Sequence, residues 1–194
     1  MPSIGGLILA AGFSQRAGRI NKLLVEYKGE SMLSHAANGL AKSRVENIVA
    51  VTGHEHETTS ALLLDIGIES VYNPAYASGL ASSLSVGLQA MAGCDAVVVC
   101  LGDMPHVTCS VINDLIDGYN TFTDRALFVP VYQAQRGNPV MIAQRFFEPL
   151  IMQTGDRGAR RLMSLYPDKV CEIEVDCAGV LKDYDTQAEL NQLL

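Results

Sequence analysis

Six apolar residues in a row, Ala96-Val97-Val98-Val99-Cys100-Leu101, stand directly before Gly102-Asp103. Because the run is continuous rather than alternating, it predicts a strand buried on both faces, as in a parallel sheet covered by helices. Other short apolar runs recur at Gly6–Ala11, Asn47–Thr52, Ile68–Tyr72 and Ala126–Tyr132. Together these runs predict a mostly parallel central sheet.

Segments with helical spacing separate these runs, at Met32–Ser43, Glu55–Asp65, Leu80–Met91 and Cys109–Tyr119. The third segment carries one apolar stripe of a helix, formed by Leu80, Leu84, Leu88 and Met91. Alternating strands and helices predict βαβ units with right-handed crossovers, and hence a three-layer α/β/α fold. Ligands of such sheets bind beyond the carboxyl ends of the strands, so the site is expected in the loops after Gly6–Ala11 and Ala96–Leu101.

The last third of the chain departs from this alternation. Its expected elements are an extended segment at Asn138–Ile142, helices at Gln144–Met152 and Gly158–Tyr166, a strand at Val170–Asp176 and a helix from Gln187. No linker or repeat interrupts the chain, and its 194 residues with 48% apolar content suit one core. We therefore expect a single domain over residues 1–194, with the last third completing the same sheet.

Composition narrows the class of partner. Charged residues make up only 18% of the chain and the formal net charge is −7, so no broad basic field is available for nucleic acid. The five cysteines are odd in number and form no C-x-x-C pair, which favours reduced thiols in a cytoplasmic protein. The N-terminal residues show no basic segment and no apolar stretch that spans a bilayer. We expect a cytoplasmic protein with neither nucleic acid nor membrane as partner.

Small residues and separated cations fill the loop after the first strand, which reads Leu9-Ala10-Ala11-Gly12-Phe13-Ser14-Gln15-Arg16-Ala17-Gly18-Arg19-Ile20-Asn21-Lys22-Leu23-Leu24. Small residues let backbone N–H groups approach a polyphosphate closely. Arg16 suits forked bonds to outer phosphates, and Lys22 offers a compact charge to the phosphoryl group that is transferred. The alternative is a surface turn with two solvated cations. The spacing matches neither a P-loop nor the G-x-G-x-x-G of dinucleotide-binding folds.

Carboxylates follow at two further places. Asp103 stands at the end of the buried run, where a lone charge is costly unless a cation such as Mg²⁺ offsets it. The segment Asp183-Tyr184-Asp185-Thr186 precedes the terminal helix, and Asp185, more than Asp183, is expected to complete the metal site. The alternative is that these residues only cap turns and helices, with Thr186 as N-cap.

With these pieces in order, the sequence resembles the molybdenum cofactor cytidylyltransferase family of the MobA-like NTP transferase superfamily, from Ile4 to Leu190. Six blocks carry the resemblance: the loop after the first strand, residues 73–84, 101–105, 136–140, 155–160 and 183–186. The resemblance implies a Rossmann-like nucleotidyltransferase fold, with residues 1–105 binding NTP and metal and residues 106–194 binding the acceptor.

The resemblance also implies roles for particular residues. NTP contacts would come from Leu9, Ala10, Ala11, Gly12, Ser14, Arg16, Lys22, Gly79, Ser82 and Ser83. Asp103 and Asp185 would hold Mg²⁺, or Mn²⁺ in its place, and Asn138, Asp156 and Arg160 would contact the acceptor. The catalytic residues would be Lys22, Arg16 and Asp103. For residues 79–83 the alternative is a helix N-terminus capped by Ser82 and Ser83.

The implied reaction transfers CMP from CTP to the terminal phosphate of molybdopterin or the molybdenum cofactor and releases pyrophosphate. The Ala10-Ala11 pair resembles the cytidylyl branch, whereas the guanylyl branch more often has a further glycine; GTP is the alternative nucleotide. Asn138 stands where many relatives carry His, so another phosphorylated acceptor, such as a sugar phosphate, is the alternative there. The product would pass to an apo-molybdoenzyme or its chaperone.

Two alternatives come from other classes: an NAD(P)H-dependent reductase on a related scaffold, and a chaperone that carries the cofactor without catalysis. The missing G-x-G-x-x-G disfavours the first, and a carrier has no need of Arg16, Lys22 and Asp103. The four histidines form no acid–base constellation in the sequence. His106 in particular is expected to be a loop or surface residue without a catalytic role.

Overall fold

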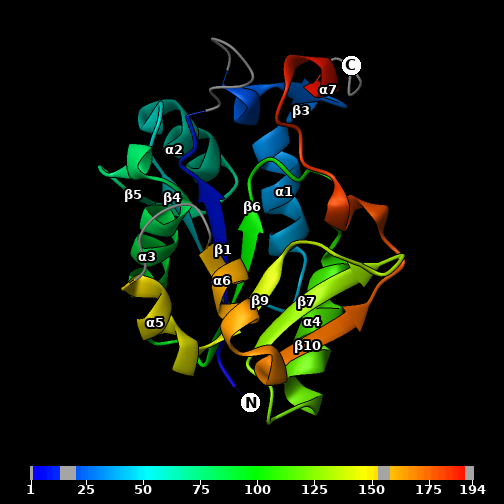
Figure 1. Cartoon of the computed structure of the whole chain (residues 1–194). Helices are drawn as coiled ribbons and strands as arrows, with labels where there is room; N and C mark the ends of the chain where they lie inside the picture. The colour runs from blue at the N-terminus through cyan, green and yellow to red at the C-terminus, as the bar shows by residue number, and fades with distance from the viewer. Residues whose placement is uncertain (1, 14–20, 153–157, 191–194) are drawn as a thin grey trace.

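The computed structural model describes residues 2–13, 21–152 and 158–190, and within them the centre of the protein is an eight-stranded sheet (Figure 1). The strands lie in the order β10-β7-β9-β6-β1-β4-β5, with β8 paired to β7. Their bounds are β1 Ile4–Ala10, β4 Asn47–Thr52, β5 Glu69–Tyr72, β6 Ala96–Leu101, β7 Leu127–Tyr132, β8 Gln135–Arg136, β9 Val140–Ala143 and β10 Val170–Glu174. The last third of the chain therefore joins the same sheet as the first two thirds.

Strand directions confirm the mostly parallel sheet. β1 pairs in parallel with β4 and β6, β4 with β5, and β7 with β10. β9 runs antiparallel to both β6 and β7. The parallel strands β1 and β6 thus lie side by side at the centre, and their carboxyl ends reach the same edge.

Helices cover both faces of this sheet. Their bounds are α1 Met32–Ala41, α2 His56–Asp65, α3 Leu80–Ala90, α4 Cys109–Thr121, α5 Phe147–Ile151, α6 Gly158–Leu165 and α7 Gln187–Leu190. Single 3₁₀ turns are η2 Lys22–Leu24, η3 Tyr76–Ser78, η4 Gln144–Phe146, η5 Pro167–Lys169 and η6 Ala178–Leu181, and β2 Glu26–Tyr27 pairs with β3 Glu30–Ser31. In Figure 1, α7 lies near β3 at the end of the molecule toward which β1 and β6 point.

The two largest clusters of the core among the described residues lie on opposite faces of the sheet. Val97 and Val99 of β6 pack with residues of α3, α5 and α6, whereas Val98 and Cys100 pack with residues of α1, α2 and α4. Because both faces are covered, every second position cannot be polar, and this explains the continuous apolar run. Burial raises the pKa of the Cys100 thiol to about 12, so it remains protonated in the interior.

Burial alone does not decide how well the predicted bounds hold, because β1 is buried along its whole length yet spans Ile4–Ala10 where Gly6–Ala11 was predicted. The observed bounds of β4 and β6 match the predicted ones. One expectation was wrong: Leu80 does not join the buried stripe of α3, since 40% of it is exposed. Leu80 is the first residue of α3 and lines a cavity, while Leu84, Leu88 and Met91 are buried.

Two further expectations were that the cysteines are reduced thiols and that no segment spans a bilayer. All five cysteines are free thiols. Across the described ranges, no helix combines the length and apolar character needed to cross a bilayer.

Candidate functional site

A cavity of about 610 Å³ opens at the carboxyl ends of β1 and β6. Its lining residues are Leu9, Ala11, Gly12, Phe13, Lys22, Leu23, Tyr76, Ala77, Gly79, Leu80, Ser83, Leu101, Asp103 and Asp185. Segments from the beginning, middle and end of the chain therefore meet at the sheet edge where the sequence predicted the site.

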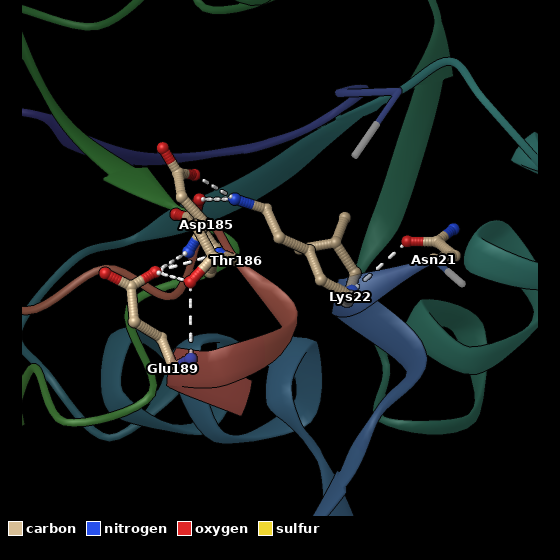
Figure 2. A network of polar contacts seen from close by, with 7 residues as sticks. Asn21, Lys22, Asp185, Thr186 and Glu189 are labelled. Atoms are coloured by element: carbon tan, nitrogen blue, oxygen red, sulfur yellow. Dashed lines mark hydrogen bonds and ion pairs between the residues drawn. The ribbon is translucent and has the colours of Figure 1, made fainter. Parts of the chain in front are cut away.

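An ion-pair cluster stands in this cavity (Figure 2). The Nζ atom of Lys22 lies 2.5 Å from Oδ2 of Asp103 and 2.6 Å from Oδ1 of Asp185. Only 12%, 17% and 31% of these three side chains is exposed, so solvent screens the charges incompletely. Burial works against the charge of Lys22, yet the attraction of the two carboxylates outweighs it and raises the pKa of the ammonium above its ordinary value. Lys22 is therefore fully protonated at neutral pH.

Asn21 fixes the conformation of the backbone next to Lys22 through hydrogen bonds of its side chain. Its Oδ1 accepts a hydrogen bond from the backbone N of Leu23 at 3.1 Å, so Asn21 is the N-cap of the turn η2 (Figure 2). Its Nδ2 donates to Oε2 of Glu55 at 3.1 Å, and only 6% of Asn21 is exposed. Neither Asn21 nor Glu55 was predicted from the sequence to have a role, although an Asn before Lys-Leu-Leu is a capping signal.

Asp185 lies two residues before the first residue of α7 and is held there by hydrogen bonds with that helix. Oε2 of Glu189 accepts hydrogen bonds from the backbone N of Asp185 at 3.0 Å and of Thr186 at 2.8 Å, and the backbone N of Glu189 donates to Oγ1 of Thr186 at 3.3 Å (Figure 2). These reciprocal bonds form a capping box and confirm Thr186 as the N-cap. Asp183 does not line the cavity; desolvation and the nearby charges of Asp103 and Asp185 raise the pKa of its carboxyl.

The Gly79–Ser83 stretch begins α3 at the cavity wall. Gly79 is the N-cap, with φ 110° and ψ 176°, and no side chain caps the helix. The alternative that Ser82 and Ser83 serve as caps is wrong, because both lie inside the first turn. Ser82 donates back to the carbonyl of Gly79 at 2.8 Å, and Ser83 accepts from Nδ2 of the buried Asn73 at 3.0 Å. Gly79 and Ser83 line the cavity, whereas Ser82 does not.

The loop after β1 is gathered at the cavity in part. Leu9, Ala11 and Gly12 line it, but the side chain of Ala10 packs on the opposite face with α1, as strand alternation requires. Ser14, Arg16 and Asp156 lie outside the described residues. Two aromatic residues that line the cavity, Phe13 and Tyr76, were not predicted as site residues; their position in loops was the available signal.

The two predicted acceptor residues that the structure describes, Asn138 and Arg160, are not part of the ion-pair cluster. The backbone N of Asn138 donates to the carbonyl of Val180 at 2.9 Å, and the side chain of Asn138 is half-buried. Arg160 is exposed on α6. Neither residue lines the cavity that holds Lys22.

The converging carboxylates fit a divalent cation. An oxygen of Asp103 and one of Asp185 both lie within 2.6 Å of a single positive nitrogen, so the two groups are aimed at one place where cationic charge is held. Mg²⁺ is bound through one or two carboxylates together with substrate phosphates and water. Among the described residues no group of three or more His, Cys, Asp and Glu gathers as a metal cage.

This combination of features defines a nucleotide-binding α/β enzyme: a cavity at the carboxyl edge of a parallel sheet, a small-residue loop, a lysine and two carboxylates. Residues 6–170 match the MobA-like NTP transferase domain, and the chain belongs to that family of nucleotidyltransferases.

Three proteins illustrate the family relationship. The chain is 26% identical to nicotine blue oxidoreductase of Paenarthrobacter nicotinovorans, over 100% of this chain and 98% of that protein. It is 26% identical to purine catabolism protein PucB of Bacillus subtilis (strain 168), over 99% and 96%. The structure of Rv0371c from Mycobacterium tuberculosis H37Rv has a TM-score of 0.86 at 26% identity, over 100% and 98%. Rv0371c has also been solved in complex with manganese, with a TM-score of 0.83 at 24% identity, over 99% and 98%.

Proposed function

We propose that the protein transfers CMP from CTP to the terminal phosphate of molybdopterin or the molybdenum cofactor, with release of pyrophosphate. The observation that carries the proposal is the position of Lys22 between Asp103 and Asp185 in a cavity that also exposes Leu9, Ala11 and Gly12. From its described residues, such a cavity offers backbone amides, the ammonium of Lys22 and two metal-binding carboxylates to a triphosphate.

The residues divide the work of binding the nucleotide. The backbone of residues 9–12 contacts the phosphates, Lys22 neutralises the α-phosphate, and Arg16 binds the outer phosphates. Asp103 and Asp185 hold Mg²⁺ or Mn²⁺, in keeping with the manganese bound by the related Rv0371c. The metal supplies charge neutralisation at the phosphate oxygens. Gly79 and Ser83 lie against the ribose and base.

The reaction itself needs no covalent intermediate with the protein. An oxygen of the acceptor phosphate forms a bond to the α-phosphorus while the bond from that phosphorus to the pyrophosphate oxygen breaks. Two anions must approach each other, so the protein contributes position and positive charge. Residues 106–194 hold the acceptor through Asn138, Asp156 and Arg160; of these, Asn138 and Arg160 lie outside the cavity lining.

The test is to incubate the protein with Mg²⁺, molybdopterin and each of the four NTPs in turn, and to measure pyrophosphate. We expect release with CTP alone. Release with GTP and not CTP contradicts the base assignment, and release with a sugar phosphate but not with the pterin contradicts the acceptor. The Asp103→Asn variant serves as the control for background hydrolysis.

The likeness to nicotine blue oxidoreductase over nearly the whole of both chains favours a second candidate, an NAD(P)H-dependent reductase. The carboxylates of Asp103 and Asp185 weigh against it, because they repel the phosphates of a dinucleotide unless a cation intervenes. Oxidation of NADH or NADPH, followed by absorbance with quinonoid dye acceptors, tests this candidate. Turnover that persists in Asp103→Asn without added metal supports the reductase.

A further inference from the structure

The side chains of His106 and Tyr184 meet outside the cavity lining. Nε2 of His106 and the hydroxyl of Tyr184 are hydrogen-bonded at 2.7 Å, across 78 positions of sequence. We propose that this pair positions the carboxylates of Asp103 and Asp185 relative to each other, and so sets the affinity of the site for a divalent metal ion. The inference rests on the metal role of these two carboxylates proposed above.

Asp185 needs such support because its segment has no regular structure of its own. Residues 182–185 are neither helix nor strand, and they lie between η6 and α7. Tyr184 is the buried anchor of this segment: 5% of it is exposed, and it packs with Met32 and Leu190. The anchor directly precedes Asp185, so a shift of Tyr184 moves the carboxylate.

His106 is the matching anchor on the Asp103 side. It lies three residues after Asp103, in the loop that joins β6 to α4. Its backbone is pressed against Gly179, where an added Cβ would come within 2.4 Å of the carbonyl oxygen of His106. Its ring meets the ring of Tyr27 edge-on, with centroids 5.4 Å apart. His106 is therefore held by packing, and its contact with Tyr184 transmits that position to Asp185.

A side-chain hydrogen bond thus joins two loops that each carry a carboxylate, from residues one and three positions away from those carboxylates in sequence. If this bond is lost, Asp185 is still held by the capping box of α7 and by its ion pair with Lys22, but the direct bond between Tyr184 and the loop of Asp103 is gone. Residues that orient metal ligands without binding the metal themselves typically change metal affinity by about 10- to 100-fold when they are removed. Neither Tyr184 nor His106 lines the cavity, so the role proposed for the pair is one of positioning.

The experiment measures Mn²⁺ binding by electron paramagnetic resonance in the presence of α,β-methylene-CTP, without turnover. Tyr184→Phe and His106→Ala are each expected to raise the half-saturating Mn²⁺ concentration about tenfold. The double variant is expected to need no more Mn²⁺ for half-saturation than the single variant with the larger effect, because both changes remove the same bond. His106→Gln retains a hydrogen-bonding group and is expected to recover part of the loss. Tyr166→Phe is the matched control, because it removes the hydroxyl of another tyrosine, one whose ring packs on Phe146.

The outcomes separate this inference from the function on which it rests. If Asp103→Asn binds Mn²⁺ as tightly as the unmodified protein, the metal site is wrong and the positioning role is overturned with it. If Asp103→Asn loses Mn²⁺ while Tyr184→Phe keeps the original affinity, only the positioning role is overturned. Thermal melting of each variant identifies unfolding, and the conservative Tyr184→Phe decides the question if His106→Ala does not fold.

Discussion

The ammonium of Lys22 and the carboxylate of Asp103 lie 2.5 Å apart, although 81 positions of sequence separate them. Each side chain is mostly buried, and within the described ranges the ammonium of Lys22 pairs with Asp103 and with Asp185. Lys22 thereby holds positive charge where the proposed reaction brings together phosphate and a divalent cation. Its removal should have different consequences for catalysis and for metal binding.

Lys22→Ala is expected to lower turnover on the order of a hundredfold or more, because a preorganised charge at the reacting phosphate is lost. Mn²⁺ affinity should be unchanged or higher, since the ammonium no longer competes for the two carboxylates. Pyrophosphate release and Mn²⁺ titration measure the two effects. Lys42→Ala, on the exposed C-terminus of α1, is the control. Near-normal turnover in folded Lys22→Ala removes the catalytic assignment.

Asp103→Asn is expected to reduce turnover by a similar factor and, unlike Lys22→Ala, to weaken Mn²⁺ binding, because a neutral amide is a poorer ligand for a hard cation. Addition of excess EDTA to the unmodified protein should abolish pyrophosphate release. The exposed Asp65→Asn on α2 controls for the loss of one negative charge. Activity that survives EDTA contradicts a metal-dependent mechanism.

Two glycines of the cavity should respond differently to alanine. Gly79→Ala should destabilise the protein by about 1–3 kcal/mol, since the backbone at φ 110° strains any residue with a Cβ. Gly12→Ala should leave stability unchanged, because an added Cβ meets nothing within 4 Å among the described residues, yet it should raise the KM for the nucleotide by crowding the phosphates. Urea unfolding and initial rates separate the effects. Equal loss of stability in both variants contradicts this prediction.

Stability should depend on pH through His106. Desolvation, followed by the charges of Lys182, Lys28 and His35, lowers the pKa of His106 below its ordinary value of 6.5. The unfolded chain therefore takes up the proton first, and the stability contribution of neutral His106 is complete above about pH 6.5 and is lost as the pH falls through the lowered pKa. His106→Gln should lose less stability than the unmodified protein between about pH 7.5 and pH 5 in urea unfolding. Parallel stability curves for the two proteins refute this assignment.

The central strands were predictable because each is a short apolar run with buried residues. The pattern located the ends of β6, which is buried over nearly its whole length, and of β4, which is buried over its second half, but it placed the start of β1 two residues too late. The direction of β9 was not predictable, since an apolar segment of four residues suits either orientation in the sheet. Leu80 was misplaced for a related reason: helical spacing names one face of a helix, but only the neighbouring segments decide whether the first turn of that face is covered.

The chemical groups of the site were also readable from the sequence, but their relations were not. Lys22, Asp103 and Asp185 each stand in a recognisable local context: a small-residue loop, the end of a buried strand, and a capping box. That one ammonium bridges two carboxylates depends on chain segments that are 81 and 163 positions apart in sequence. The hydrogen bonds that join Asn21 to Glu55 and His106 to Tyr184 also link distant parts of the chain, so they too could not be predicted from the sequence.

By itself, the sequence determined the layered α/β class, the sheet edge that carries the site and the residue types available there, because periodicity and turn chemistry are local properties of the chain. Tertiary structure alone decided which charges neutralise one another, which loops are joined by a hydrogen bond and which predicted residues reach the cavity. These are long-range properties, because ion pairs and hydrogen bonds act over a few ångströms and only the packed fold brings distant segments within that range.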